Sequence, residues 1–338
     1  MLSSDIPYHI VLGGVLGSRE QSARAGLCRA RRRPLAVFVS LLLSGCGHSA
    51  TQPTPAALVP SPSPSPSTPR VVIFSVDGLR PDALLQAGAP AIMGLAARGA
   101  YTWQAQTIMP STTLPSHASM LSGYLPSAHG ITWDDYRPEK GLIPVPTVFT
   151  AARAAGLRTV LVAGKEKFRQ LDVPGMIQRF DLCAGDDQEV ATRAIAESMA
   201  GFDLMFVHLP QTDMTGHAQG WMSGAYLDAI ANADRAVGRV LAVLPEGTTV
   251  IVTADHGGHD WNHGTTQAVD MRIPWVAAGP RIPARALTRS IVTTDTAATA
   301  AWVLGLNLSG GATGRPVLEA FDVASVAAAG SGRTARSR

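Results

Sequence analysis

The sequence predicts an α/β domain of the three-layer α/β/α sandwich type, with a mainly parallel central sheet. Short apolar runs rich in β-branched residues alternate with longer helical stretches, and this order places helices on both faces of a parallel sheet. Between its two unusual ends the chain has about 250 residues, which suits one large domain with a buried core. Acidic and histidine residues follow directly after several apolar runs, as in sheets that bind ligands at the carboxyl ends of their strands.

The individual elements follow from the length and pattern of each segment. Short, continuous apolar runs are predicted as strands covered on both faces. These strands are, in chain order, Val71–Val76, Thr159–Ala163, Leu204–Leu209, Thr249–Thr253 and Ile273–Ala277. The longer segments between and after them are predicted as the helices that cover the sheet. These helices are Pro81–Arg98, Ser116–Leu121, Thr147–Ala155, Gln188–Ala200, Met222–Leu244 and Thr294–Leu304.

Residues 1–46 have the features of a bacterial lipoprotein signal peptide with a long n-region. Arginines precede an apolar run from Leu35 to Leu43, which suits the h-region of a secretory signal but is too short to cross a bilayer. The sequence LSGC, which ends at Cys46, resembles the lipobox, in which the cysteine thiol carries a diacylglycerol. An ordinary signal peptide with an incidental cysteine is the alternative. We therefore expect an exported bacterial lipoprotein, periplasmic or at the cell surface, tethered to a membrane by a lipid on Cys46.

Three further segments follow this leader. Residues 47–70 are rich in proline and serine, which favours an extended spacer without a core of its own. Residues 71–323 carry the alternating pattern and form the predicted globular domain. Residues 324–338 show no periodicity and are predicted to be disordered.

Charge and cysteine content exclude several classes of protein. The formal net charge is +3, and much of the positive excess lies at the two ends of the chain. The middle therefore shows no basic face of the kind that nucleic-acid-binding proteins have. Cys28 and Cys46 belong to the leader, and Cys183 is alone in the globular part. The mature domain is thus predicted to have neither a disulfide nor a cysteine cluster for a metal.

Side chains with the chemistry of metal ligands occur in three groups. They are Asp77; Asp213 with His217; and Asp255, His256 and His263. Each group follows an expected strand closely. Because the carboxyl ends of parallel strands meet at one edge of a sheet, we expect these side chains to converge. Carboxylate oxygen mixed with imidazole nitrogen suits zinc best, with manganese or iron as alternatives, and the set is large enough for two divalent ions.

A threonine between the first two groups is a candidate nucleophile. Thr113 precedes Pro115 and a helical stretch, and proline favours the first turn of a helix, so the threonine is expected at a helix N-terminus. Backbone N–H groups and the positive end of the helix dipole face a bound phosphate at such a place. A threonine hydroxyl attacks only when a metal or a base lowers its pKa. Ser111 and Thr112 carry the same functional group, and spacing alone does not choose among the three.

The remaining histidines of the globular part are predicted to have structural roles. His208 lies inside an expected strand and is interpreted as a hydrogen-bonded core residue. His117 and His129 are expected to pack or to form hydrogen bonds. His259 is expected near the ligands without binding a metal itself.

The segment MPSTTLPSHASMLSGYLPSAHGI and the order of the ligand groups resemble the type I phosphodiesterase/nucleotide pyrophosphatase family of the alkaline phosphatase superfamily. The resemblance covers roughly residues 71–280 and implies an alkaline-phosphatase-like fold with Thr113 as the nucleophile. It further implies the two sets of metal ligands. They are Asp213, His217 and His263 for one ion, and Asp77, Asp255 and His256, with Thr113, for the other.

Substrate binding is expected from three further residues. Many members of the family have an asparagine after the sequence His-Gly-Ile, whereas this chain reads HGITWDDY and has Asp134 in that place. An ionised carboxylate there repels phosphate unless it is protonated, binds a metal or lies in a differently arranged loop. Lys165 and Lys167 resemble the paired lysines that hold the substrate carboxylate in phosphonoacetate hydrolase. A solvated charged turn is the alternative for this pair.

These features together predict a hydrolase with two divalent ions that cleaves phosphodiester or pyrophosphate bonds through a phospho-threonine intermediate. The expected substrate is a small phosphodiester or a nucleotide, and residues 71–323 form the catalytic domain. A phosphonate or phosphomonoester hydrolase of the same superfamily is the alternative that Lys165 and Lys167 favour. A non-catalytic lipoprotein that binds phosphorylated ligands is the alternative from a different class.

Overall fold

The computed structural model describes residues 68–183, 185–308 and 310–322. The predicted signal peptide, the lipidation site Cys46, nearly all of the spacer and the tail at 324–338 lie outside these residues. Among the helices that the structure describes, none combines the length and the apolar character that crossing a membrane requires.

The described residues form a central sheet of eight strands, in the order β4-β3-β5-β1-β6-β7-β2-β8. The strands are β1 Arg70–Val76, β2 Ala100–Gln106, β3 Thr159–Ala163, β4 Arg179–Leu182, β5 Leu204–Leu209, β6 Thr248–Thr253, β7 Arg272–Ala278 and β8 Arg285–Ala286. Strands β4, β3, β5, β1 and β6 run parallel, whereas β7 is antiparallel to both of its neighbours, β6 and β2. The prediction of a mainly parallel sheet is confirmed.

The centre of the sheet is its most apolar part. Every residue of β3, β5 and β6 is buried, and so is every residue of β1 after Arg70. Helices cover both faces of the sheet, so neither face of these strands meets water. This is why the strands are continuous apolar runs and do not alternate between apolar and polar residues. The carboxyl ends of β5, β1 and β6 therefore lie side by side on a rigid base.

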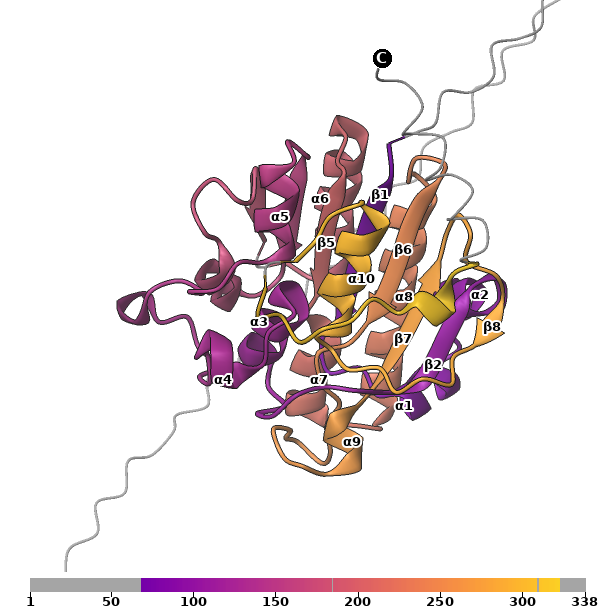
Figure 1. The fold of residues 1–338 in the computed structure, drawn as a ribbon. Helices are drawn as coiled ribbons and strands as arrows, with labels where there is room; N and C mark the ends of the chain where they lie inside the picture. The colour runs from indigo at the N-terminus through magenta and orange to yellow at the C-terminus, as the bar shows by residue number, and fades with distance from the viewer. Residues whose placement is uncertain (1–67, 184, 309, 323–338) are drawn as a thin grey trace, which may run out of the picture. The chain divides into compact units, whose positions relative to one another are not determined.

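Helices form a layer on each side of the sheet (Figure 1). On one side α1 Pro81–Gln86, α2 Pro90–Arg98, α6 Asp187–Ala200 and α7 Gln211–Gln219 pack around α8 Gly224–Leu241. On the other side α3 Thr113–Ser122 and α5 Val148–Ala154 pack with α10 Asp295–Val303, which lies in front of the central strands in Figure 1. The short elements are the helices α4 Pro126–His129 and α9 Ala268–Met271 and the 3₁₀ turns η1 Pro138–Lys140, η2 Glu166–Leu171 and η3 Leu318–Ala320.

The sequence prediction differs from the structure in several places. The helix expected over Pro81–Arg98 is two helices, because Gly88 adopts a left-handed conformation with φ 63° and Pro90 begins a new helix. Strands β2, β4 and β8 were not predicted, because they lie toward the edges of the sheet and lack continuous apolar runs. The segment that carries Asp213 is a helix, α7, which is not among the predicted helices.

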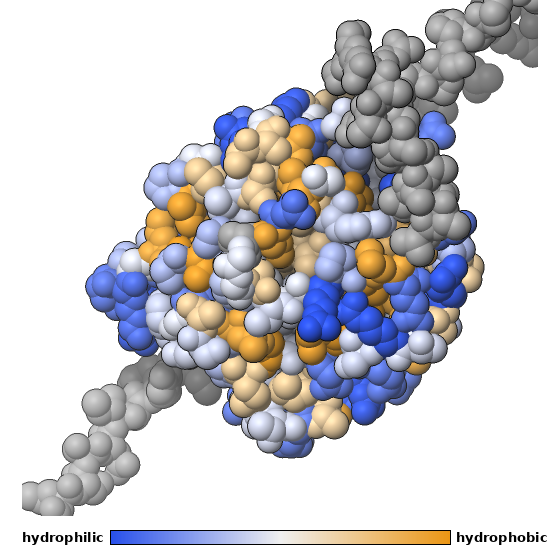
Figure 2. All heavy atoms as spheres, in the orientation of Figure 1, coloured by the Kyte–Doolittle hydropathy of each residue, from blue (hydrophilic) through white to orange (hydrophobic). Residues whose placement is uncertain are grey.

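Helix α3 is longer than predicted and is buried along its whole length. It begins at Thr113 and ends at Ser122, where Gly123 takes a left-handed φ of 76° and closes the last turn. Because solvent reaches none of its sides freely, α3 is held firmly, and so is the threonine at its N-terminus. The face of the domain that carries α10 shows hydrophobic and hydrophilic residues interspersed (Figure 2).

Candidate active site

Three adjacent strands deliver the predicted metal ligands to one edge of the sheet. Asp77 follows the last residue of β1, and Asp255 with His256 follows β6. Asp213 lies in the first turn of α7, directly after β5. Ligand atoms of Asp77, Asp255 and His256 lie within 4.8 Å of one another, and the same holds for Asp213, His256 and His263. The convergence expected from the strand-end positions is confirmed.

Each of the three aspartates has one oxygen fixed by the protein. In Asp255, Oδ1 accepts hydrogen bonds from the backbone N–H of Gly78 (3.1 Å) and His256 (3.0 Å). In Asp77, Oδ2 accepts from Nε2 of His208 (2.8 Å). The second oxygen of each aspartate, Asp77 Oδ1, Asp213 Oδ1 and Asp255 Oδ2, has no hydrogen-bond partner within the described part of the chain.

Within the part of the chain that the structure describes, five buried polar atoms in this region lack a hydrogen-bond partner. They are Asp77 Oδ1, Asp213 Oδ1, Asp255 Oδ2, His256 Nε2 and Thr113 Oγ1, none of which has a hydrogen-bond partner among the described residues. We call them the free atoms. A buried polar atom without a partner is costly, and several of them at one place indicate a ligand that satisfies them. Carboxylate oxygens and an imidazole nitrogen are the donors that zinc, manganese and iron accept, so the residues fit a divalent metal centre.

The histidines of the site are oriented by backbone carbonyl groups. Nδ1 of His256 donates to the carbonyl of Gly257 (2.7 Å), Nδ1 of His263 to that of Ser111 (3.0 Å), and Nδ1 of His217 to that of Trp261 (2.9 Å). In the neutral form of each ring these bonds place the proton on Nδ1, which leaves Nε2 with a lone pair for a metal.

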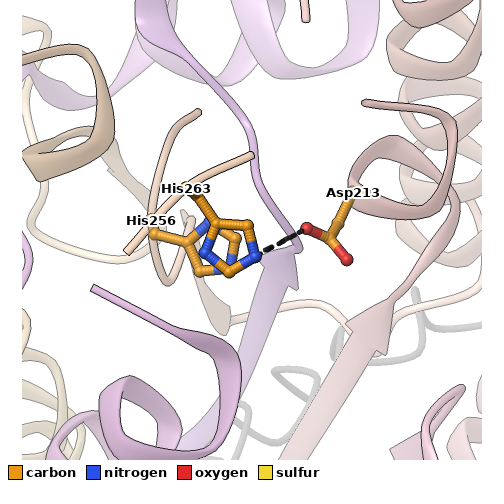
Figure 3. A group of neighbouring side chains, drawn as sticks. All are labelled: Asp213, His256 and His263. Atoms are coloured by element: carbon orange, nitrogen blue, oxygen red, sulfur yellow. Dashed lines mark ion pairs between the residues drawn. The ribbon is translucent and has the colours of Figure 1, made fainter. Parts of the chain in front are cut away.

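The rings themselves lie close together. His256 and His263 are stacked, with ring centroids 3.8 Å apart, and face the Asp213 carboxylate on α7 (Figure 3). Asp213 Oδ1 lies 3.5 Å from Nε2 of His263 and 3.5 Å from Nε2 of His217. His217 has a more exposed side chain than the others, and its Nε2 lies 3.1 Å from Nε2 of His263. The compact group around Asp213 thus contains His256 and His263. His217, the third residue of the expected set, lies close to Asp213 and His263 at the exposed border of this group.

Thr113 is the first residue of α3 and is buried beside these ligands. Two contacts fix the helix to the Asp255 loop and to β1: the hydroxyl of Ser116 donates to the carbonyl of Asp255 (2.7 Å), and Nε2 of His117 accepts from Ser75 Oγ (2.8 Å). Nδ1 of His117 donates to the carbonyl of Thr113 (2.7 Å). The hydroxyl of neighbouring Ser111 is engaged elsewhere, with the carbonyl of residue 265 (2.9 Å).

Asp134 and Lys167 lie at the N-terminus of α3, and Lys165 lies against the aspartates of the site. Asp134 Oδ1 accepts from the backbone N–H of Leu114 (2.7 Å), and its Oδ2 pairs with Nζ of Lys167 (2.7 Å). The carboxylate therefore sits where the dipole of α3 and an ammonium group both favour negative charge. Lys165 pairs with Asp77 Oδ2 (2.7 Å) and with Asp213 Oδ2 (2.5 Å). Both lysines thus contact carboxylates of the site.

Burial and neighbouring charges shift the pKa values of the predicted metal ligands strongly. Burial and the nearby charge of Asp77 raise the pKa of Asp255 well above its ordinary value. Burial opposes ionisation of Asp77 too, but Lys165 and His208 outweigh it and hold the pKa of Asp77 well below its usual range. Burial disfavours the charged form of His256, yet Asp255 and Asp77 raise its pKa to about 10. The carboxylates therefore attract positive charge of any kind.

Sequence reasoning gave His208 and His117 structural roles, and their hydrogen bonds confirm these roles while bringing both residues next to the site. His208 lies opposite Ser75 in the register of β5 and β1, so its ring reaches the Asp77 carboxylate. A histidine on the strand beside an aspartate-bearing strand was the available signal. His129 accepts from or donates to Ser119 Oγ (2.9 Å), as expected of a hydrogen-bonding residue.

Comparison with known proteins decides the family. The family model described as type I phosphodiesterase / nucleotide pyrophosphatase matches residues 71–279, more than half of the chain. The chain belongs to this family. The resemblance that the sequence motifs carried is therefore confirmed.

Curated relatives share only part of their length with this family member. Phosphopentomutase of Deinococcus radiodurans is 34% identical over 165 residues, which are 45% of this chain and 41% of that protein. Human ectonucleotide pyrophosphatase/phosphodiesterase family member 1 is 23% identical over 239 residues, which are 61% of this chain and 25% of that protein. The chain thus spans about two fifths of the first relative and a quarter of the second.

Solved structures share the fold. Murine ectonucleotide pyrophosphatase/phosphodiesterase 5 superposes with a TM-score of 0.65 at 15% identity, covering 75% of this chain and 100% of that one. An inactive threonine-to-alanine variant of the murine protein, in complex with AMP, gives a TM-score of 0.64 at 15% identity, covering 74% of this chain and 98% of that one. A phosphonate monoester hydrolase from Silicibacter pomeroyi gives 0.57 at 15% identity, covering 73% and 75%. The predicted α/β fold of the alkaline phosphatase type is confirmed.

Proposed function

We propose that this protein is a metal-dependent hydrolase that cleaves phosphodiester or pyrophosphate bonds of small, nucleotide-type substrates with Thr113 as the nucleophile. Membership of the family supports phosphoryl-transfer hydrolysis in general. The observation that carries the specific proposal is the set of free atoms, three carboxylate oxygens, an imidazole nitrogen and the Thr113 hydroxyl, none of which has a hydrogen-bond partner among the described residues. The carboxylate oxygens and the nitrogen belong to residues that converge, and the helix that begins at Thr113 is bonded to the Asp255 carbonyl through Ser116.

The residues fit two divalent ions, with zinc favoured by the mixed oxygen and nitrogen donors and manganese or iron compatible with them. Asp77, Asp255 and His256 would hold one ion, and Asp213 and His263, with His217 at the border, would hold the other. When bound, such ions lower the pKa of a hydroxyl and stabilise the charge on a phosphoryl group.

The protein's own groups would position the nucleophile and the phosphate. Thr113 lies at the N-terminus of α3, where the helix dipole favours the phosphoryl oxygens, while the backbone N–H of Leu114 is held by Asp134. The hydrogen bond from His117 to the Thr113 carbonyl orients the first turn. In the proposed reaction the threonine oxygen forms a bond to phosphorus as the bond to the leaving oxygen breaks. Water then attacks the phospho-threonine and releases the phosphate product with Thr113 restored.

The substrate class and the location complete the proposal. The solved complex of the murine protein with AMP supports a nucleotide-type substrate. The leader and the cysteine at position 46 motivate a periplasmic or cell-surface location, with the domain tethered to the membrane by a lipid. Analysis of the purified, exported protein by mass spectrometry, with and without Cys46→Ser, tests the lipid.

The alternative of a phosphonate or phosphomonoester hydrolase depended on the paired lysines. In the structure both ammonium groups contact carboxylates, Lys165 those of Asp77 and Asp213, and Lys167 that of Asp134. A lysine that is already paired is less available for a substrate carboxylate. The diesterase therefore remains the better-supported proposal.

Comparison of three substrates tests this choice. We expect hydrolysis of bis-p-nitrophenyl phosphate to exceed that of p-nitrophenyl phosphate and phosphonoacetate. Thr113→Ala should reduce turnover by about a thousandfold or more while metal content stays near that of the wild type. Thr113→Ser, which keeps a hydroxyl, is the matched control and should retain part of the activity. Near wild-type turnover in Thr113→Ala would remove this residue from the mechanism.

A further inference from the structure

Lys165 occupies a central position between the two groups of predicted metal ligands. It follows β3 and precedes the turn η2, and its side chain is 15% exposed. Its Nζ lies 2.7 Å from Asp77 Oδ2 and 2.5 Å from Asp213 Oδ2. One ammonium group therefore joins an aspartate of one metal group to an aspartate of the other.

Lys165 contacts the carboxylate oxygens of Asp77 and Asp213 that are not free atoms. Asp77 and Asp213 each give Oδ2 to the ammonium, whereas Oδ1 of each is a free atom. By holding Oδ2, the lysine fixes the rotation of both carboxylates and keeps Oδ1 available to a metal as a single-oxygen ligand.

The ammonium also carries a permanent charge at this place. The carboxylates of Asp77 and Asp213 contact this positive charge directly, through Oδ2 in each case. Because the groups are buried, water screens these charges poorly.

We propose that Lys165 is a resident cation of the metal centre, which orients Asp77 and Asp213 and limits the affinity of the centre for divalent ions. Lys165 is thus a positioning residue and not a ligand of the substrate. The inference rests on the proposed metal-dependent function. Its physical basis is repulsion: a divalent ion held by Oδ1 of either aspartate would share that carboxylate with the ammonium, and the two positive charges would repel each other.

Two effects of removing the lysine oppose each other, and their sizes decide the outcome. Loss of orientation weakens metal binding, but the oxygens remain attached to rigid elements, the end of β1 and the first turn of α7. Loss of the positive charge strengthens metal binding, and at short range in a buried site this charge effect is the larger one. Removal of the ammonium should therefore raise the affinity for divalent ions.

Metal affinity, measured without substrate, tests the proposal. The protein is stripped of metal, and Zn²⁺ and Mn²⁺ are titrated in competition with a chromogenic chelator. We expect Lys165→Met, which keeps the apolar stem, to bind Zn²⁺ about tenfold more tightly or better. Lys165→Arg, which keeps the charge, should stay within about threefold of the wild type. The matched control is Lys167→Met, two residues away, which pairs with Asp134 and should change the affinity by less than about twofold.

The outcomes separate this inference from the proposed function. Wild-type protein that binds neither metal overturns the proposed metal centre itself. Wild-type protein that binds metal, with Lys165→Met equal or weaker in affinity, overturns the inference alone. An equal gain in Lys167→Met also overturns it, because the effect would then not depend on contact between the ammonium and the metal-ligand aspartates. Lys165→Gln gives the same comparison if Lys165→Met does not accumulate as folded protein.

Discussion

The substitution Asp255→Asn separates the oxygen that supports the fold from the oxygen assigned to a metal ion. Oδ1 of Asp255 accepts from the backbone N–H of Gly78 and of His256, and an amide oxygen accepts the same two bonds. The other oxygen, a free atom, becomes an NH₂ group that binds no metal. Because burial and Asp77 raise the pKa of Asp255, its charge destabilises the native state at pH values above 3.8. The metal-stripped variant should therefore be at least as stable as the wild type.

The expected effect on metal-induced stability follows from linkage. An ion present at 100 times its Kd adds about 2.7 kcal/mol, and the Tm of a domain of this size moves by about 2–4 °C per kcal/mol. Each ion should therefore raise the Tm of the wild type by about 5–10 °C. Asp255→Asn should lose the increment of one ion.

Differential scanning calorimetry of stripped protein, with and without Zn²⁺, measures this increment. Asp228→Asn is the control, because Asp228 is exposed on α8 and should respond to zinc like the wild type. A full zinc response in Asp255→Asn would refute the assignment of this oxygen to a metal. A metal-stripped variant that is much less stable than the wild type would refute the division of roles between the two oxygens.

Three further substitutions test the neighbourhood of the centre. Asp134→Asn keeps the oxygen that accepts from α3, but it removes a negative charge and frees Lys167. The affinity of the protein for inorganic phosphate, measured by calorimetry, should therefore rise about tenfold. Unchanged affinity would place Asp134 away from the bound anion. Gly257→Ala should lower zinc affinity and cost about 1–3 kcal/mol in chemical unfolding, because its Cβ would overlap the Val269 carbonyl; wild-type values would show that the loop adapts. Burial raises the pKa of Asp187 from 3.8 to about 7. The native state therefore binds this proton more tightly than the unfolded state, and the free energy of unfolding falls as the pH rises from 3.8 to about 7. Asp187→Asn should reduce that fall by at most ~2–4 kcal/mol, and an identical pH slope in both proteins would contradict the assignment.

The sequence was informative where local pattern and tertiary role agree. Strands β1, β3, β5 and β6 are continuous apolar runs because both of their faces are covered, and all four were predicted within a residue or two. Strand β2 has the alternating pattern of a less enclosed strand and pairs with β7 and β8 through contacts distant in the sequence. The residues of β2 alone therefore do not predict which strands it pairs with.

The same distinction applies to the site. The metal-ligand candidates were identifiable because each follows a strand end, and the sheet itself brings strand ends together. The side chains that hold the bonded oxygens of these aspartates were not identifiable, because their contacts depend on strand register and on the position of the strand ends. His208 reaches Asp77 only because β5 aligns it with Ser75, and Lys165 reaches two aspartates from the end of β3. The role of Asp134 required the distance to the first turn of α3, which spacing does not give.

The imidazoles of the centre take their orientation from main-chain carbonyl groups, at Ser111, Gly257 and Trp261. A carbonyl is present whatever side chain stands at that position. The identity of residue 261 is therefore uncoupled from the alignment of His217, and its indole, 63% exposed, stands at the border of the centre. Another side chain can therefore replace the indole at this position while the imidazoles keep their orientation.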